Sequence, residues 1–260
     1  MARFSANLGF LWPDRPLLQR IEAAHRAGFK AIELHWPYDV PAEEVRAACA
    51  SRGLALLGIN TAVGDAARGE FGLGAVPGRE DAFQASVDQA IAYCRASGAT
   101  AIHAMAGVVA PTQMAEATGV FVENLQRAAE KAAAHGLALL LEPINQRDKP
   151  GYFYSTIARA AEMITRVGAP NVKIMFDVYH VGVSEGDVLK RLERYLPLIG
   201  HVQIAAVPSR AEPDEGEIAF PAIFAALDQL GYDGWVGCEY KPRGDTDAGL
   251  AWTGKLGVTL

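Results

Sequence analysis

The segment "ALLLEPINQRDKPGYFY" at residues 138–154 carries an acid where a buried strand would be expected to stay apolar. The run from Leu137 to Leu141 is wholly apolar and predicts a strand that is covered on both faces, as in parallel sheets. Glu142 follows this run directly. Because a buried carboxylate is costly unless a partner neutralises it, its presence here predicts a functional site at the carboxyl end of the strand.

Seven further β-rich runs repeat this pattern, and each is followed by a segment of helical periodicity. The expected strands are residues 4–11, 31–36, 54–60, 101–107, 137–145, 172–180, 201–205 and 235–240. Segments such as 16–28 and 41–53 place apolar residues at helical spacing and end on a glycine, which tolerates the left-handed conformation after a helix. Eight such units without a linker predict a single-domain (β/α)8 TIM barrel over residues 1–260. An open doubly wound sheet would carry a glycine-rich phosphate turn after its first strand, and "LGFLWPD" is not one.

The composition narrows the class of protein. Half of the residues are hydrophobic, which supplies a large core, and the net charge of −6 argues against a nucleic-acid surface. Three cysteines without paired spacing fit a reducing compartment. The apolar runs are shorter than the roughly 20 residues that span a bilayer, and the N-terminus lacks the apolar core of a signal peptide. We therefore expect a cytoplasmic protein that acts on a small molecule, without nucleic-acid or membrane partners.

A long connection, residues 61–80, follows the third expected strand. It contains five glycines, at positions 64, 69, 72, 74 and 78. Long connections on the catalytic side of a barrel often form lids or binding loops, and we expect a lid here. Phe71 and Leu73 lie in this connection, and as exposed apolar residues they would suggest contacts between copies in a homo-oligomer.

Polar side chains stand at the carboxyl ends of the last four expected strands. They are Glu142, Asp177, Gln203 and Glu239. In a barrel these ends face one shared mouth, so the four side chains are expected to lie together. Three carboxylates buried close together need a cation, and an all-oxygen set favours Mg²⁺ or Mn²⁺ over Zn²⁺. The alternative is that each acid forms a separate structural ion pair, with Arg147, Lys173 or Lys241 as partners.

Such a site suits proton transfer at a carbon next to a carbonyl group. Loss of that proton produces an enediolate, which a divalent cation would stabilise. One carboxylate can take the proton, and the same or a second carboxylate can return it. Isomerisation or epimerisation of an α-hydroxy carbonyl compound needs these parts. Phosphate hydrolysis would more often bring several histidine ligands and a basic track, which an acidic chain with six histidines does not provide.

Further candidates lie near the same mouth. His180, three residues after Asp177, is placed either to hydrogen-bond a substrate oxygen or to make a loop contact. Arg210 would clamp a substrate carboxylate with two hydrogen bonds, or else is a solvated loop arginine. His103 stands near the end of the fourth strand, where it either binds substrate or is a structural histidine. Glu33 lies within the second strand, and we expect a structural role for it.

At these residues the sequence resembles the hydroxypyruvate isomerase family, within the larger group of xylose-isomerase-like barrels. The resemblance runs along almost the whole chain, through "FSANLGFLW", "GFKAIELHWPYD", "LEPINQRDKPGYFY", "DVYH", "GHVQIA" and "GYDGWVGCEYKP". It implies the barrel fold and the interconversion of hydroxypyruvate and tartronate semialdehyde, or the isomerisation of 2-oxo-tetronates in close relatives. It also implies that Glu142 and Glu239 are the acid–base pair, and that His180 and Arg210 contact the substrate. The metal ligands it implies are Glu142, Asp177, Gln203 and Glu239.

The sequence departs from the family pattern outside the four metal positions. Ala206 replaces an acid, Ser209 a glycine and Ala211 a histidine. The predicted lid also lacks the tryptophan that the family commonly places after "GD". Isomerase chemistry is therefore expected, while the substrate stays open between a small hydroxy-oxo acid and a neutral ketose. A barrel that binds a sugar acid without catalysis is the alternative outside enzymes.

Overall fold

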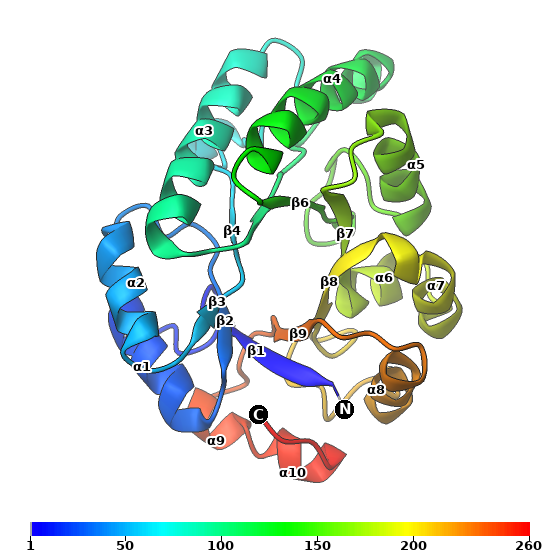
Figure 1. Cartoon of the computed structure of the whole chain (residues 1–260). Helices are drawn as coiled ribbons and strands as arrows, with labels where there is room; N and C mark the ends of the chain where they lie inside the picture. Colours follow the sequence, from blue (N-terminus) through cyan, green and yellow to red (C-terminus); the bar gives the residue numbers. More distant parts are fainter. Residues whose placement is uncertain (1) are drawn as a thin grey trace.

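Short apolar runs form the strands of a parallel barrel in the computed structural model, which describes residues 2–260 (Figure 1). The strands are β1 (Arg3–Asn7), β2 (Ala31–Glu33), β3 (Ala55–Leu56), β4 (Gly58–Asn60), β5 (Ala101–His103), β6 (Ala138–Leu141), β7 (Val172–Asp177), β8 (Ile199–Ile204) and β9 (Trp235–Cys238). They are hydrogen-bonded in the order β3-β2-β1-β9-β8-β7-β6-β5-β4. This is the predicted (β/α)8 barrel, with one of its eight strand positions divided between β3 and β4.

The third strand is interrupted at Leu57, so the expectation of one continuous strand there is wrong. β3 pairs with β2, whereas β4 pairs with β5. The backbone bends so that each half can reach a different neighbour. Leu34 N donates to Gly58 O at 3.0 Å, and Asn60 N donates to His35 O at 2.8 Å. These two hydrogen bonds close the barrel on this side.

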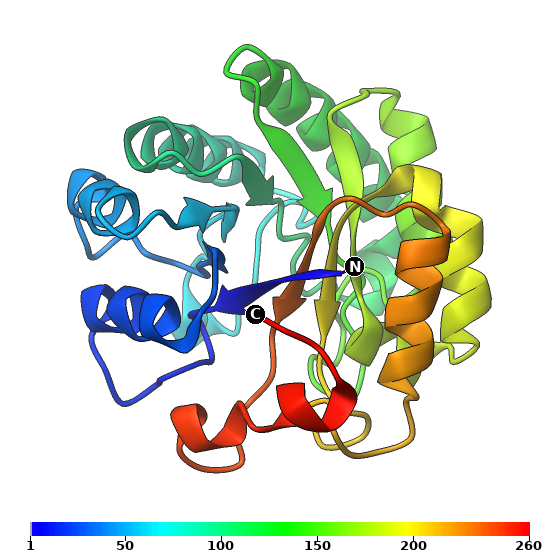
Figure 2. The ribbon, with the colours of Figure 1, turned by 60° about the horizontal axis from the view of Figure 1, so that its bottom comes forward.

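Helices surround the strands on the outside (Figure 2). They are α1 (Leu17–Ala27), α2 (Ala42–Ala50), α3 (Glu80–Ser97), α4 (Met114–Ala133), α5 (Ile157–Val167), α6 (Val178–Ser184), α7 (Val188–Tyr195), α8 (Phe220–Gln229), α9 (Thr246–Gly249) and α10 (Trp252–Leu256), with short 3-10 helices η1 (Ala66–Arg68), η2 (Pro111–Gln113) and η3 (Leu196–Leu198). Each long helix buries an apolar face, with Phe83 of α3 and Phe121 of α4 fully buried. α1 ends at Gly28, whose φ of 105° is a conformation that glycine adopts at low cost. Within residues 2–260, no helix combines the length and apolar character needed to cross a bilayer.

The sixth predicted strand, residues 172–180, is a strand only as far as Asp177. The Asp177 carboxylate accepts a hydrogen bond from Tyr179 N at 2.8 Å and caps the first turn of α6. The first strand likewise ends at Asn7, whose Oδ1 accepts from Gly9 N at 2.9 Å and turns the chain. Polar side chains at the strand ends therefore stop the strands as well as entering the barrel mouth.

The connection 61–80 is partly built into the fold. After an exposed stretch around η1, Gly74 N donates to Met105 O at 3.0 Å, so the second half lies along the chain that leaves β5. Leu73 is 3% exposed and Phe71 is half-buried. Leu73 is therefore not exposed as expected, because this half packs inward, whereas Phe71 is partly exposed. The role of the connection as a lid stays a prediction.

Candidate active site

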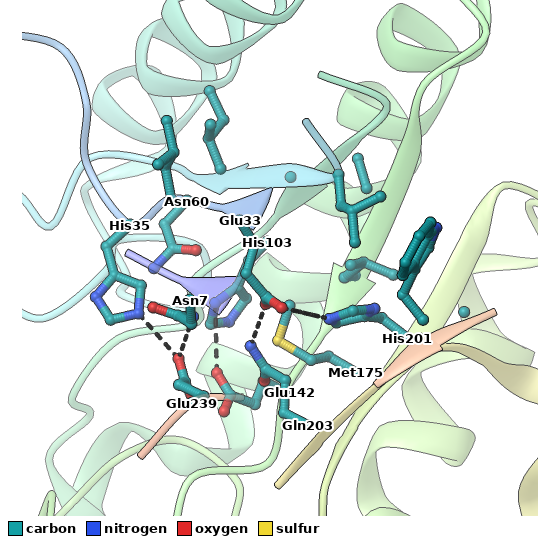
Figure 3. Close-up of a pocket in the computed structure, with 18 of the residues that line it drawn as sticks. Asn7, Glu33, His35, Asn60, His103, Glu142, Met175, His201, Gln203 and Glu239 are labelled. Carbon is teal, nitrogen blue, oxygen red and sulfur yellow. Dashed lines mark hydrogen bonds and ion pairs between the residues drawn. The ribbon is translucent and has the colours of Figure 1, made fainter. Parts of the chain in front are cut away.

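The carboxyl ends of strands β6 to β9 meet around one cavity (Figure 3). Glu142 directly follows β6, Asp177 ends β7 and Gln203 lies in β8. Glu239 directly follows β9, and all four residues are at most 5% exposed. Glu142, Gln203 and Glu239 line a cavity of ≈160 Å³ inside the barrel. Glu142 and Glu239 also line a wider cavity of ≈590 Å³, which forms the mouth. The structure therefore brings the predicted residues together.

Three buried oxygen atoms in this group find no hydrogen-bond partner among residues 2–260. They are Glu142 Oε1, Asp177 Oδ2 and Gln203 Oε1. A buried acceptor without a partner costs about 1–3 kcal/mol, and such groups often mark a functional site or an ion. Two carboxylates and an amide oxygen are ligands of hard cations such as Mg²⁺ and Mn²⁺. The chemistry of these three atoms therefore fits ligands of a divalent cation.

His180 is placed as a proton donor into the site. Its Nδ1 accepts from Asn145 N at 3.1 Å and lies 2.7 Å from the Asn145 amide nitrogen. Burial, with the nearby charge of Arg210, lowers the pKa of His180, so the ring is neutral and its proton is assigned to Nε2. Nε2 lies 3.6 Å from both Glu142 Oε1 and Asp177 Oδ2. Glu142, Asp177 and His180 could also hold a metal ion together, since one ligand atom of each lies within 4.8 Å of the others. The proton assigned to Nε2 of His180 favours a role as hydrogen-bond donor instead.

Glu239 lies among hydrogen-bond donors and a positive charge. Its Oε1 accepts from Asn7 Nδ2 at 3.1 Å and lies 2.9 Å from His35 Nε2. Its Oε2 accepts from Arg210 Nη2 at 3.1 Å. Burial acts to raise the pKa of Glu239, but the His35 hydrogen bond and the Arg210 charge outweigh burial and lower it to about 2. Glu239 is therefore ionised at neutral pH.

The pKa values of Glu142 and Asp177 are raised, in contrast to that of Glu239. Burial, and then the negative charge of Glu239, raise the pKa of Glu142 well above its usual value. The same causes raise the pKa of Asp177 to about 8. A bound cation would favour the ionised form of Asp177. Neighbouring carboxyl groups whose pKa values are driven apart are typical of acid–base sites.

Arg210 lies inside the site and not in solvent. Its Nη1 donates to Asp148 Oδ2 at 3.2 Å, and its guanidinium lies about 5 Å from the rings of Phe10 and Tyr179. Its backbone φ of 58° is left-handed, which costs a non-glycine residue roughly 1–2 kcal/mol. The two terminal nitrogens of Arg210, which were predicted to bind a substrate carboxylate, therefore already pair with Asp148 and Glu239. Its Nε is buried and finds no partner in the described chain.

Ala206, Ser209 and Ala211, the positions that the resemblance sets apart, lie in the loop that carries Arg210. Ala206 N donates to Ala211 O at 2.9 Å, and Arg210 N donates to Ala206 O at 2.8 Å. Ala206 and Ala211 are both buried. Ser209 Oγ donates to Glu215 at 2.7 Å. These substitutions therefore act on the backbone that positions Arg210.

His103 ends β5 and lies at the same mouth. Its Nδ1 is 3.4 Å from Glu142 Oε2, and its buried Nε2 finds no partner among residues 2–260. Burial lowers the pKa of His103 to about 4, so the ring is neutral. His103 is therefore in contact with Glu142 and lines the cavity, as a substrate-binding residue would.

Sequence reasoning missed several residues of the site. Asn7 and His35 both contact Glu239, and Asn145 sets the tautomer of His180. A signal was present for the first two, because each is a polar residue at or just after the end of an apolar strand, as in "FSANLG" and "IELHW". Asn145 lies four residues after the end of β6, so its position relative to the strand did not indicate a functional role.

Aromatic and basic side chains surround the entrance to the wider cavity. The aromatic residues are Phe10, Trp36 and Phe71, and the basic residues are Lys149, Arg210 and Lys241. Lys149 Nζ lies 4.3 Å from the centre of the Phe71 ring. Trp36 is 38% exposed. The entrance therefore combines positive charge with flat apolar surface.

Known proteins share this sequence and architecture. The xylose isomerase-like TIM barrel family matches residues 21–256. A 2-oxo-tetronate isomerase from Cupriavidus necator is 46% identical over 97% of this chain and 97% of its own length. The hydroxypyruvate isomerase of Escherichia coli is 40% identical over 97% and 98%. The crystal structure of an AP endonuclease, family 2, from Brucella melitensis superimposes with a TM-score of 0.95 at 41% identity, over 98% of this chain and 99% of that one. The chain belongs to the xylose isomerase-like TIM barrel family.

Proposed function

We propose that the protein is an isomerase that interconverts the aldehyde and ketone forms of a small hydroxy-oxo acid. The observation that carries the proposal is the pairing of two carboxyl groups in one cavity. Glu239 is held ionised by Arg210 and His35, while Glu142 favours its protonated form. Relatives that are 40% and 46% identical over nearly their whole length are named as isomerases of hydroxypyruvate and 2-oxo-tetronate, which supports this reaction class.

The proposed reaction moves one proton between adjacent carbons. Glu239, as the base, takes the proton from the carbon that bears the hydroxyl group. Glu142, which keeps its proton while the cation is bound, delivers that proton as the acid to the former carbonyl carbon, and the hydroxyl proton passes to the former carbonyl oxygen. Proton exchange with solvent then returns both carboxyl groups to their starting states. His180 Nε2, which lies 3.6 Å from Glu142 Oε1 and from Asp177 Oδ2, would donate its proton in a hydrogen bond to one of these substrate oxygens. Mg²⁺ or Mn²⁺, held by the four predicted ligands, would supply positive charge beside the enediolate oxygens.

The charge at the entrance favours an acid over a neutral ketose as the substrate. Lys149 and Lys241 line the wider cavity together with Arg210, whose Nε is without a partner among the described residues. Arg210 already pairs with Asp148 and Glu239, whereas the two lysines can attract a substrate carboxylate and pair with it. A neutral ketose would make no use of the charge of these two lysines.

A nuclease function fits this site less well, although a solved relative carries that name. Binding of a DNA backbone needs a basic stripe, and the chain has a net charge of −6. The basic residues of the entrance line the cavity together with three aromatic residues, Phe10, Trp36 and Phe71. Failure to bind abasic DNA at low salt is the expected result.

The proposal is tested by incubating the protein in heavy water with hydroxypyruvate, a 2-oxo-tetronate and neutral ketoses, with and without a chelator. We expect conversion of an acid substrate, with deuterium at the reacting carbon, and loss of activity with chelator that Mn²⁺ restores. Glu142→Gln and Glu239→Gln should each nearly abolish turnover while thermal unfolding is unchanged. Full activity in either variant would refute its role in the pair. Ligand-induced stabilisation without conversion or exchange of any substrate would indicate a binding protein instead.

A further inference from the structure

Glu33 is a buried carboxylate inside the barrel that the proposed reaction does not use (Figure 3). It ends β2 and is 4% exposed. Ser5 Oγ donates to its Oε1 at 2.9 Å, and His201 Nε2 lies 3.1 Å from both of its oxygens. These partners come from β1 and β8 and hold the carboxylate in one orientation.

The amide of Gln203 turns one end to Glu33 and the other end to the candidate metal site. Its Nε2 donates to Glu33 Oε2 at 2.7 Å. Its Oε1 is one of the three buried oxygens that find no partner among residues 2–260. An amide that rotates by half a turn exchanges oxygen and nitrogen with almost no change in shape. The reversed amide would direct its N–H groups at the metal site and its oxygen at the Glu33 carboxylate, where two acceptors would repel each other.

We propose that Glu33 is a positioning residue for the metal, because it fixes the Gln203 amide with its oxygen toward the cation. The inference rests on the proposed function, in which Gln203 is a metal ligand. Before the cation binds, its charge cannot select between the two orientations of the amide, and the hydrogen bond to Glu33 makes this selection. Loss of such an outer partner typically lowers metal affinity by about 10- to 100-fold.

The adjacent strand leaves room for this arrangement. Gly237 of β9 pairs in register with Gln203 of β8. A Cβ at Gly237 would overlap Glu33 Oε1 and lie 3.0 Å from Gln203 Cγ. A side chain at this position would therefore push the Glu33 carboxylate and the Gln203 side chain out of place. Gly237→Ala consequently offers a second way to disturb the same contact without changing a charge.

The test is the affinity for Mn²⁺, measured by electron paramagnetic resonance titration of the full chain without substrate. Four proteins form a cycle: wild type, Glu33→Gln, Gln203→Ala and the double variant. Glu33→Gln keeps the size of the side chain but presents an amide that can pair with either end of Gln203. We expect its Mn²⁺ affinity to fall by about 10- to 100-fold. In the Gln203→Ala background the same change should have little further effect, because Glu33 acts through Gln203.

The cycle separates positioning from a general effect of charge. An equal loss of affinity on Glu33→Gln with and without Gln203 would overturn the proposal, because it would show that only the negative charge matters. Unchanged affinity in Glu33→Gln would overturn it as well. If Glu33→Gln does not fold, Glu33→Asp replaces it, because it keeps the charge but withdraws the carboxylate from the Gln203 amide, and it should show the same dependence on Gln203. Wild-type protein that binds no Mn²⁺ would overturn the metal site of the proposed function, a different result from either of these.

Discussion

Replacing Arg210 by methionine tests how the site keeps Glu239 ionised. Methionine keeps an unbranched stem but removes the guanidinium, whose Nη2 lies 3.1 Å from Glu239 Oε2. After the change, burial still disfavours the ionised carboxylate, and the His35 hydrogen bond still favours it. We therefore expect the pKa of Glu239 to rise from about 2.

The size of the rise follows from the distance. Two unit charges at 3.1 Å interact by about 5 kcal/mol at an effective dielectric constant of about 20. Water that enters the space left by the guanidinium replaces part of this stabilisation of the carboxylate. If half of the interaction energy is lost, the change is about 2.5 kcal/mol, or about two pKa units. The pKa of Glu239 would then be about 4 in Arg210→Met. Since the ionised form is the proposed base, kcat should fall as the pH drops through this value, whereas the wild-type base stays ionised to about pH 2.

The assay is the pH dependence of kcat for isomerisation of the acid substrate, at saturating Mn²⁺. Metal occupancy is followed by electron paramagnetic resonance at each pH, so that loss of metal is not mistaken for protonation of Glu239. Asp148→Asn is the matched control, because it removes the other partner of Arg210 and leaves the contact with Glu239. If kcat falls at the same acidic pH in Arg210→Met and in the wild type, with the metal site fully occupied in both, the electrostatic role of Arg210 is refuted.

Three further results are expected. Mn²⁺ binding at pH 7 should release protons, because the pKa of Asp177 is raised to about 8, and fewer protons should be released as the pH increases. Calorimetry in buffers of different ionisation enthalpy measures this release, and no release would contradict it. Burial raises the pKa of Cys49 to about 11 and the pKa of Cys94 to about 12. A thiol reagent at pH 8 should therefore react slowly with the native protein and fast with the protein unfolded in urea. Rapid labelling of the native protein would contradict the burial of these cysteines. Phe121→Ala should lower the free energy of unfolding by about 3–5 kcal/mol in urea titrations, and a loss below about 1 kcal/mol would show that the α4 face is not packed as described.

Local sequence was sufficient to predict the barrel and four residues at its mouth. The alternation of apolar strands with helical periods depends on residues that are close in the chain, and it identifies each unit by itself. Glu142 and Asp177 stand out because each interrupts an apolar run within its own strand. The interruption of the third strand at Leu57 could not be predicted in this way, because it depends on which neighbour each half pairs with.

Tertiary structure alone decided which side chains meet and in what state. Asn7 and His35, from the start of the chain, contact Glu239 near its end because closure of the barrel pairs β1 with β9. Arg210 reaches the same carboxylate from a loop held in a left-handed conformation, and together they set the pKa of Glu239. Hydrophobic periodicity is a property of neighbours in sequence, whereas charge, hydrogen bonding and burial at the site are produced by groups that only the closed barrel brings within a few ångströms of one another.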